Sequence, residues 1–592
     1  MKFPYGNADF YQIITEDYVY VDRTNRIPLV EEFGKTLLFL RPRRFGKSLW
    51  LSTLWNYYDV NRADEFEQLF GHLAIGQNPT PKHNQYLILK WNFSVVATQG
   101  DIKEIRQALY NHLNQAMKNF AMRYRTILPY PIEFNPNDPI ASLESTLTIA
   151  QTTPYKVYLL IDEYDNFANE VLMARRRGNE KRYDDLIKGE GMLKTLFKVV
   201  KDGTEGQGID RVFITGVSPV VMSDVTSGFN VADNIYLEPE FNDLCGFTEA
   251  ELISVLEQVG EHCTFSPDKT SEMLTLLRTF YDGYCFSPQS KEHIYNPTLA
   301  LYFLKYLYRT CRIPERLLDE NLAMDRGKIA YIAQSPSGKE LVWDTLMEQK
   351  QIVLERLTYR FGVEDILVDQ KDNQFLISLL YYFGVLTLTT ERTVHGEPTF
   401  QIPNMVIRGL YAERIREMVL PTGPDLDAGK RVARLLYQHG QIEPLCDFIE
   451  QRQFKVFDNR DYREANELVV KAVFLALLFN DILYIMDSEP ALGRRYGDLL
   501  MLVRPDKRQY ALLDVLIEFK YVSLGEVKLT GEQVRNKNRA ELEALDAVQT
   551  ALTKAETQLT SYRQTLTEKY GSLLDLRTFT VVSVGYDRLV WK

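Results

Sequence analysis

Residue types that could hold a chain of phosphates lie next to one another near the start of the sequence. The apolar run Thr36–Leu40 continues directly into Arg41-Pro-Arg-Arg-Phe-Gly46-Lys47-Ser48. A Gly-Lys-Ser tripeptide that opens a helix is typical of a phosphate-binding loop, in which backbone amides point at anionic oxygens. Lys47 would contact the β- and γ-phosphates of ATP, and the Ser48 hydroxyl would ligate Mg²⁺. The usual loop begins with glycine, whereas this chain has Arg41 there.

Two carboxylates after a second apolar run would supply the other half of such a site. The bulky residues Val157–Ile161 predict a strand buried on both faces of a parallel sheet. Asp162 and Glu163 follow at its carboxyl end, where open α/β sheets bind ligands. Asp162 would hold Mg²⁺, and Glu163 would orient or activate the attacking water. Either motif alone fits an ordinary turn, but the two together favour ATP binding and, less directly, hydrolysis.

A third apolar run, Arg211–Thr215, ends in the small polar segment Gly216-Val-Ser-Pro219. A polar side chain at that strand end, Thr215 or Ser218, could sense the γ-phosphate, and an ordinary strand with a turn explains the pattern equally well. The other residues predicted to bind nucleotide lie in the loop and the first helical turn: Arg41, Arg43, Arg44, Phe45, Gly46 and Leu49.

A second candidate site lies in an apolar hairpin near the end of the chain. Tyr496–Val503 predicts a strand that contains Asp498, and after a polar turn the chain returns as Tyr510–Lys520. Residues two apart in a strand share a face, so Glu518 and Lys520 point together. Folding the hairpin brings Asp498 opposite residues close to Glu518.

These three charged residues predict metal-dependent cleavage of a phosphodiester. Asp498 and Glu518 would hold Mg²⁺, and Lys520 would orient a water or stabilise charge on the phosphate. The alternative is an amphipathic hairpin with outward charges, but apolar neighbours flank Glu518 and Lys520, as in an inner strand. Further polar residues could reach this site or be ordinary surface groups: Glu467, Asp514, Arg535, Lys537, Arg539, Gln558 and Tyr562.

The overall composition indicates a globular protein with several domains. The chain has 592 residues, of which 45% are apolar and 25% charged, and its net charge is −11. We expect roughly three or four domains at that length. The acidic balance excludes a protein coated with basic surface, so a nucleic-acid partner would need a local patch.

The cysteines and histidines predict no metal site. The five cysteines are scattered without a Cys-x-x-Cys pair, which predicts reduced thiols in a cytoplasm: Cys245, Cys263, Cys285, Cys311 and Cys446. The seven histidines are equally dispersed. The first residues lack a secretory apolar core, and the apolar stretch Leu468–Phe479 is too short to span a bilayer. We therefore expect a cytoplasmic protein without a membrane partner.

The secondary structure predicted to position the two sites differs between regions of the chain. Residues 1–245 alternate strands and helices and predict an α/β fold with a doubly wound sheet. Residues 246–340 predict a helical lid, which opens with the capping box Thr248-Glu-Ala-Glu251. The predicted strands of the first region are Tyr18–Val21, Thr36–Leu40, Tyr86–Asn92, Val157–Ile161, Arg211–Thr215 and Ile235–Leu237.

The second half predicts two further domains. Residues 341–424 resemble a winged helix, because helix Phe375–Phe383 precedes a hairpin and another helix. Such a unit could contact DNA or simply pack against the rest. It ends in the linker Pro421-Thr-Gly-Pro424. Residues 425–592 carry the hairpin with Glu518 and predict a separate α/β/α domain.

The motifs together resemble the bacterial and archaeal AAA-ATPase-like proteins whose C-terminal domain is a PD-(D/E)XK-type nuclease. The resemblance rests on Phe3–Gly6, Tyr20–Thr24, Leu40–Ser48, Ile161–Glu163, Thr215–Ser218, Tyr281–Tyr284, Tyr295–Pro297, Gly497–Asp498 and Glu518–Lys520. It implies a P-loop ATPase core, ATP and Mg²⁺ as cofactors, a restriction-endonuclease-like domain and roles in defence against foreign DNA. The family carries arginine at the first loop position, so Arg41 could itself touch phosphate. Gly497 stands where the family usually has proline before the acid.

Three functions are compatible with these features. The first is an ATP-regulated, Mg²⁺-dependent nuclease that acts on nucleic acid, with DNA favoured. The second is a nucleotide-switched sensor or nucleic-acid-binding module without cleavage activity. The third is a small-molecule P-loop kinase, which leaves Asp498, Glu518 and Lys520 unexplained. AAA-type cores often form rings, so a homo-oligomer is an open expectation, with Arg175-Arg-Arg177 either an arginine finger in trans or an exposed basic loop.

Overall fold

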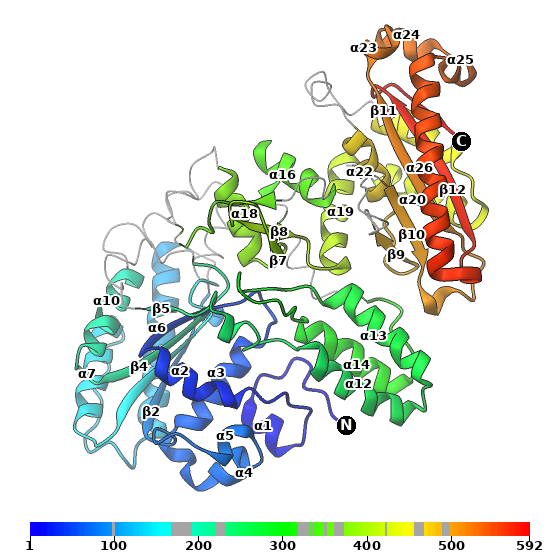
Figure 1. Cartoon of the computed structure of the whole chain (residues 1–592). Coiled ribbons are helices and arrows are strands. Elements are labelled where there is room, and N and C mark those ends of the chain that lie inside the picture. The colour runs from blue at the N-terminus through cyan, green and yellow to red at the C-terminus, as the bar shows by residue number, and fades with distance from the viewer. Residues whose placement is uncertain are drawn as a thin grey trace. The chain divides into compact units, whose positions relative to one another are not determined.

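The computed structural model describes thirteen stretches of the chain: residues 1–97, 101–166, 192–219, 232–317, 329, 332–333, 336–347, 352–359, 361, 372–420, 423–454, 467–487 and 498–592. The chain divides into two compact units, which are described separately here (Figure 1). The first unit comprises Met1–Thr270, Asp282–Arg312 and Val353–Phe400. The second comprises Ser271–Tyr281, Ile313–Ile352 and Gln401–Lys592.

A five-stranded parallel sheet forms the core of the first unit, with the strand order β2-β3-β4-β1-β5. Its strands are β1 (Thr36–Leu40), β2 (Tyr86–Asn92), β3 (Lys156–Asp162), β4 (Ile209–Gly216) and β5 (Asp233–Asn234). Every residue of β1 is buried, as expected for a strand covered on both faces. Because β4 lies between β1 and β3, the carboxyl ends of all three strands meet at one sheet edge.

The first unit also contains a set of helices. They are α1 (Phe10–Thr15), α2 (Ile27–Phe33), α3 (Lys47–Tyr58), α4 (Phe66–Phe70), α5 (Ala74–Gln77), α6 (Ile102–Arg123), α7 (Pro139–Gln151), α10 (Met192–Thr204), α12 (Glu249–Cys263), α14 (Pro297–Thr310) and α18 (Asn373–Tyr382). Helix α3 packs against β2, β3 and β4, and α7 lies beside α10 (Figure 1). The predicted parallel α/β sheet is confirmed. The predicted strand Tyr18–Val21 is wrong, because this segment forms a single bridge between Tyr18 and Lys2.

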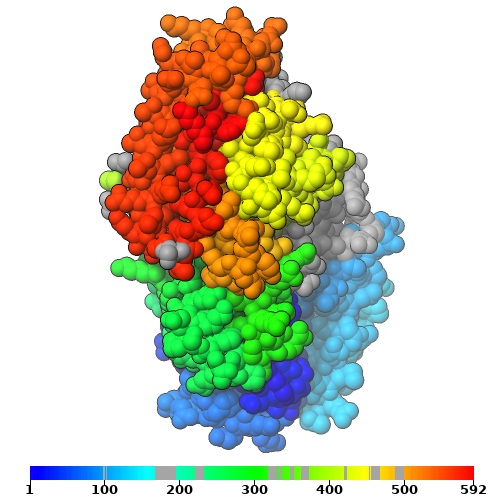
Figure 2. Space-filling model, turned by 90° about the vertical axis from the view of Figure 1, so that its right-hand side faces the viewer, coloured from blue at the N-terminus to red at the C-terminus, as the bar shows by residue number. Residues whose placement is uncertain are grey.

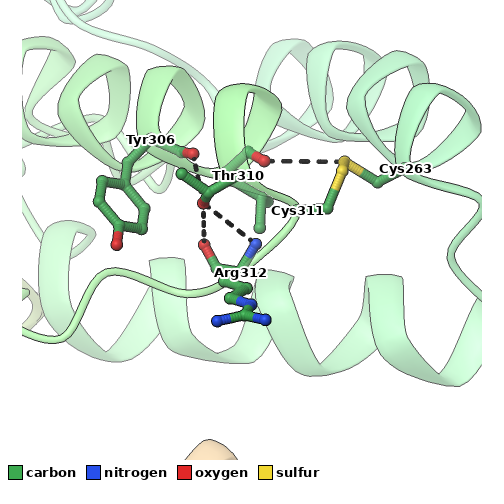
Figure 3. Close-up of a disulfide and its surroundings, with 6 residues drawn as sticks. Cys263, Tyr306, Thr310, Cys311 and Arg312 are labelled. Carbon is green, nitrogen blue, oxygen red and sulfur yellow. Dashed lines mark hydrogen bonds between the residues drawn. A yellow bond between two sulfur atoms is a disulfide. The ribbon is translucent and has the colours of Figure 1, made fainter.

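Helices α12 and α14 pack against each other and carry the predicted capping box. The Thr248 side chain accepts from the Glu251 amide, and the Glu251 side chain accepts from the Thr248 amide. At their far ends, Cys263 and Cys311 form a disulfide (Figure 3). The prediction of reduced thiols is therefore wrong for this pair. The pairing joins residues 48 positions apart, and such connectivity cannot be deduced from cysteine spacing.

The predicted hairpin after α18 is present as β7 (Thr387–Arg392) and β8 (Pro398–Gln401), which join β6 (Ile352–Val353) in a three-stranded sheet. The next helix, α19 (Met405–Val419), belongs to the second unit. The predicted linker ends inside helix α20 (Gly423–His439), because proline is tolerated in the first helical turn. The sequence-based division into four domains stays a prediction.

The second unit contains a mixed sheet with the order β13-β12-β11-β10-β9. Its strands are β9 (Tyr484–Asp487), β10 (Asp498–Val503), β11 (Asp514–Val522), β12 (Leu576–Val584) and β13 (Arg588–Trp591). Strand β11 pairs in parallel with β12 and antiparallel with β10. The other helices are α13 (Pro267–Tyr281), which begins in the first unit, α16 (Pro336–Met347), α21 (Glu443–Phe448), α22 (Glu467–Leu478), α23 (Leu524–Val527), α24 (Gly531–Asn536), α25 (Arg539–Glu543) and α26 (Asp546–Tyr570).

The sheet of the second unit lies between α26 and α22. Leu516 of β11 packs against Leu559 and Leu566 of α26, whereas the ring of Phe519 packs against that of Phe474 in α22. Because alternate residues of a strand face opposite sides, these contacts assign the two helices to opposite faces. In Figure 2 the yellow segment with α20 and α21 lies against the red end of the chain, where Glu450 pairs with Arg588 at 3.0 Å.

None of the helices in the described stretches combines the length and apolar character that a bilayer crossing needs.

Candidate functional site

The loop between β1 and α3 opens onto a pocket of about 280 Å³ in the first unit. Gly46 caps α3 with a φ of +95°, a left-handed conformation that glycine adopts without strain. No other group lies within 4 Å of the place that a Cβ at Gly46 would occupy. The first amides of α3 have no side-chain cap, so their donors are available to an anion.

Lys47 is held inside this loop by the main chain. Its Nζ donates to the carbonyl oxygens of Arg41 at 2.8 Å and Pro42 at 3.0 Å. Burial lowers the pKa of Lys47, and the nearby carboxylates of Glu163 and Asp162 oppose that shift. An anion in the pocket would offer the ammonium group a charged partner in place of two neutral carbonyls.

The end of β3 brings the predicted carboxylates to the same region. Asp162 is buried, and its Oδ1 accepts a 2.7 Å hydrogen bond from the Thr215 hydroxyl. Glu163 follows with a φ of +50° and lines the pocket with Lys47 and Ser48. Burial raises the pKa of the Glu163 carboxyl, and the Lys47 charge lowers it by a smaller amount. A protonatable carboxylate and an ammonium group therefore share one pocket.

Thr215 and Ser218, the two alternatives predicted for a phosphate sensor, have different surroundings. Thr215 contacts Asp162 at the sheet edge. The Ser218 hydroxyl and amide both donate to Asp165 Oδ2, at 3.0 and 2.8 Å. Asp165 also accepts from the Val217 amide and is fully buried. Ser218 thus stabilises the turn after β4, and Thr215 is the group that contacts the carboxylate.

Arg41 does not line the pocket. Its side chain is 1% exposed, and its guanidinium donates to four carbonyl oxygens, those of Leu40, Tyr236, Phe241 and Asn242. The group also lies over the rings of Phe39 and Phe286, and burial lowers its pKa to about 10. The expectation that Arg41 touches phosphate therefore disagrees with this structure. The residue instead joins the end of β1 to the segment after β5.

The other predicted loop residues fall into two groups. Arg43 donates to the Asn166 side chain and, like Arg41, is absent from the pocket lining. The predicted residues that line the pocket are Arg44, Phe45, Gly46, Lys47, Ser48, Leu49 and Glu163. Asp162, Thr215 and Ser218 are not among the lining residues. The predicted basic segment Arg175-Arg-Arg177 lies outside the described residues.

Three segments outside the phosphate-binding loop and the carboxylate motif complete the pocket. They contribute Pro4 and Tyr20 from the N-terminal region, Leu244 and Phe247 from the segment before α12, and Leu301 from α14. Arg23 holds the middle segment by an ion pair with Glu251 and a 2.6 Å hydrogen bond to the Asp243 carbonyl. Apolar residues like these carry no recognisable chemistry, so only the fold shows that they form a wall.

The second candidate site lies on β10 and β11 of the second unit. Asp498 pairs directly with Glu518 in the antiparallel register, so the two positions lie on one face of the sheet. Lys520 Nζ lies 2.6 Å from Glu518 Oε1 and 3.5 Å from Glu467 Oε1. The main chain of Asp498 is described, and its side chain lies outside the described atoms.

Glu518 combines deep burial with an oxygen that has no hydrogen-bond partner in the described part of the chain. The carboxyl is fully buried, and burial raises its pKa while Lys520 partly offsets that rise. Its Oε2 has no hydrogen-bond partner among the described residues, and neither does Thr580 Oγ1 at the paired position of β12. A third buried oxygen without such a partner, Gln558 Oε1, lies on α26, which packs against both strands. Hard oxygen donors of this kind fit Mg²⁺.

Several neighbouring charges have structural roles. Asp514 is fully buried and accepts from the amides of Val503 and Asp575 and from Arg508, so it fastens the ends of three strands. Arg535 pairs with Asp587, and Arg539 pairs with Asp447 at 3.0 Å. Arg535 and Arg539 therefore both have acidic partners within the second unit.

The chain resembles known proteins over part of its length, with a family match in its first part and two wider similarities. Residues 4–226 match the family model described as "Predicted AAA-ATPase". An uncharacterized protein from the vnfD 5′ region of Azotobacter chroococcum is 24% identical over 426 residues, which is 71% of each chain. The Aeropyrum pernix ORC1 protein, solved in complex with DNA, is 13% identical, with 68% of this chain and 96% of that chain covered at a TM-score of 0.25.

Proposed function

We propose, from the AAA-ATPase family match over residues 4–226 and the pocket between β1 and α3, that the first unit binds and hydrolyses ATP. One observation carries this proposal: Lys47 and Glu163, from distant parts of the sequence, line the same pocket beside open amides of α3. A small-molecule kinase would share the loop. It would give no role to the carboxylates of β11.

Each residue of the pocket has a defined part in this reaction. The α3 amides and Lys47 would hold the β- and γ-phosphates, with Lys47 exchanging two carbonyl partners for phosphate oxygens. Ser48 and Asp162 would hold Mg²⁺, which supplies positive charge beside the phosphates when bound. Glu163 would accept a proton from the water that attacks the γ-phosphorus. Thr215 would keep Asp162 oriented through their hydrogen bond.

The apolar wall suits the base of the nucleotide. Pro4, Leu244, Phe247 and Leu301 lie in the same pocket as the phosphate-binding loop. A planar ring buried against such residues gains hydrophobic free energy without needing charged partners. We therefore assign the base to this wall and the phosphates to the α3 amides.

Phosphate release by the purified chain with ATP and Mg²⁺ tests the proposal. We expect Glu163→Gln to bind ATP with nearly wild-type affinity and to lose at least about a hundredfold in turnover, as general-base removal does. Equal turnover of the variant and the wild type would reject the assigned base.

A second candidate function is metal-dependent cleavage of nucleic acid by the second unit. It is favoured by the buried Glu518, whose Oε2 has no partner among the described residues and whose Oε1 contacts Lys520. Glu518 and Asp498 would hold Mg²⁺, which polarises a phosphodiester when bound. Lys520 would stabilise the negative charge that develops on the phosphate. DNA as substrate and a role in defence rest on the family resemblance alone.

A cleavage assay separates this proposal from a sensor that binds without cutting. The full chain is incubated with single- and double-stranded DNA and RNA, with and without ATP, and with Mg²⁺ or Mn²⁺. Cleavage that needs the metal supports the nuclease. Binding to these polymers without any cleavage supports the nucleotide-switched sensor.

A further inference from the structure

The disulfide between Cys263 and Cys311 joins the far ends of two helices whose near ends reach the nucleotide pocket. Cys263 is the last residue of α12, and Cys311 caps the C-terminus of α14 (Figure 3). Beside it, the His262 ring stacks on Tyr308 with centroids 4.0 Å apart. The disulfide and the ring stack thus hold these helix ends together.

The near ends of the same helices build part of the pocket. Helix α12 follows directly on Leu244–Phe247, and α14 contributes Thr298 and Leu301. The Thr298 hydroxyl donates a 2.8 Å hydrogen bond to the carbonyl of Arg44 in the phosphate-binding loop. A helix of 14 residues carries a shift at one end about 20 Å to the other, since each residue rises about 1.5 Å.

Thiol chemistry in this chain is concentrated at that pair. The other three cysteines, Cys245, Cys285 and Cys446, are buried. Burial raises the pKa of Cys245 to about 11 and raises those of Cys285 and Cys446 as well, so these thiols stay protonated and shielded. Neither Cys263 nor Cys311 is among the buried residues.

We propose that Cys263 and Cys311 are a reversible dithiol–disulfide modification site that sets the affinity of the pocket for nucleotide. The inference rests on the proposed ATP binding. A thiolate of a dithiol reductant attacks one of the two sulfurs and breaks the bond between them, which gives a mixed disulfide and one protein thiolate. The second thiol of the reductant then displaces the other protein sulfur, so two electrons and two protons reach the protein and the reductant becomes a disulfide.

The oxidised form is the tighter binder in this scheme. The disulfide adds a covalent constraint at the far ends of α12 and α14 to the backbone bridge between Phe247 and Tyr295 at their near ends. In this scheme both constraints act on the positions of Leu244–Phe247 and Leu301 in the pocket wall. After reduction, the Cys263 thiol can donate to the Leu307 carbonyl, whose oxygen lies 3.6 Å from Sγ, and the stack of His262 on Tyr308 remains. The change is therefore a local loosening of the wall, which ATP must reverse when it binds.

Titration calorimetry with ATP and Mg²⁺ tests the inference on the full chain, oxidised with glutathione disulfide or reduced with dithiothreitol. Native alkylation followed by mass spectrometry counts the exposed thiols in each sample. We expect two additional reactive thiols after reduction, at Cys263 and Cys311, and a Kd for ATP that is at least about fivefold higher. The control is C263S/C311S, which should bind like the reduced wild type and ignore the reductant.

The outcomes distinguish this inference from the proposed function. Equal Kd values for oxidised and reduced protein, with reduction verified by alkylation, would overturn the redox coupling and leave ATP binding intact. A pair that dithiothreitol fails to reduce without unfolding would overturn reversibility. Loss of ATP binding in both states would instead reject the nucleotide site itself. If the double variant misfolds, comparison of the two wild-type states still decides.

Discussion

The Thr215 hydroxyl donates a 2.7 Å hydrogen bond to Asp162 Oδ1 across the ends of β4 and β3. Both groups are buried, so neither can exchange this contact for water. The bond occupies Asp162 Oδ1, so under the proposed function Oδ2 is the oxygen that would face a cation. The two groups can meet because β4 lies directly beside β3 in the sheet.

Thr215→Val should therefore lower ATP turnover by roughly 10- to 100-fold, the usual cost of removing a group that orients a metal ligand. Valine keeps the shape of threonine and leaves Asp162 without its donor. Steady-state phosphate release measures the effect, and Thr215→Ser, which keeps the hydroxyl, is the matched control. Full activity of the valine variant would argue against any role for this bond.

Arg41→Lys should lower the free energy of unfolding by about 3 kcal/mol or more. A lysine cannot reach the four carbonyls that Arg41 joins, and each buried acceptor left unsatisfied costs about 1–3 kcal/mol. Urea denaturation followed by fluorescence measures the change. A variant with normal stability that fails to bind ATP would restore the phosphate-contact role predicted from the sequence.

The pH dependence of turnover should report the raised pKa of Glu163. Burial favours the protonated carboxyl, so ATP turnover should fall on acidification at a pH above the ordinary value of 4.5. A pH–rate profile at saturating ATP checks this. An acidic fall in turnover whose midpoint lies at or below the ordinary glutamate pKa would contradict this prediction.

The raised pKa of Glu163 should also make the stability of the protein depend on pH. The folded-state pKa of Glu163 is raised, so the protonated carboxyl contributes to the free energy of unfolding at low pH. That contribution is lost as the pH rises through the raised pKa, because a buried charge then forms. Glu163→Gln should thus melt above the wild type at pH 8 in the absence of nucleotide, and the difference should vanish below pH 4.5. Thermal melts of both proteins across this range test the sign.

Lys520→Ala should reduce metal-dependent cleavage of nucleic acid at least about a hundredfold while ATP binding persists. The ammonium group of Lys520 contacts Glu518 Oε1, the carboxylate oxygen that has a partner among the described residues. Lys554→Ala, which removes an exposed lysine from α26 of the same unit, is the control. Identical cleavage by both variants would assign the activity elsewhere.

Sequence patterns predicted what depends on periodicity and on motifs. Strands β1 and β2 begin and end at the predicted residues. Asp498, which was expected opposite residues close to Glu518, pairs with Glu518 itself. The patterns could not predict the direction in which each polar side chain points or the groups that it contacts. Arg41 and Ser218 have suitable chemistry at suitable positions, yet both are committed to buried contacts that only the folded chain creates. The disulfide is of the same kind, since it depends on two helices ending side by side.

Titration of ATP and Mg²⁺ into the wild type and Lys47→Ala tests the central assignment most directly, with Lys103→Ala, an exposed lysine of α6, as control. We predict saturable binding for the wild type and the control, and a loss of at least about tenfold in affinity for Lys47→Ala, because the proposed contact of its ammonium group with the phosphates would be lost. Unchanged affinity of Lys47→Ala would contradict the assigned pocket.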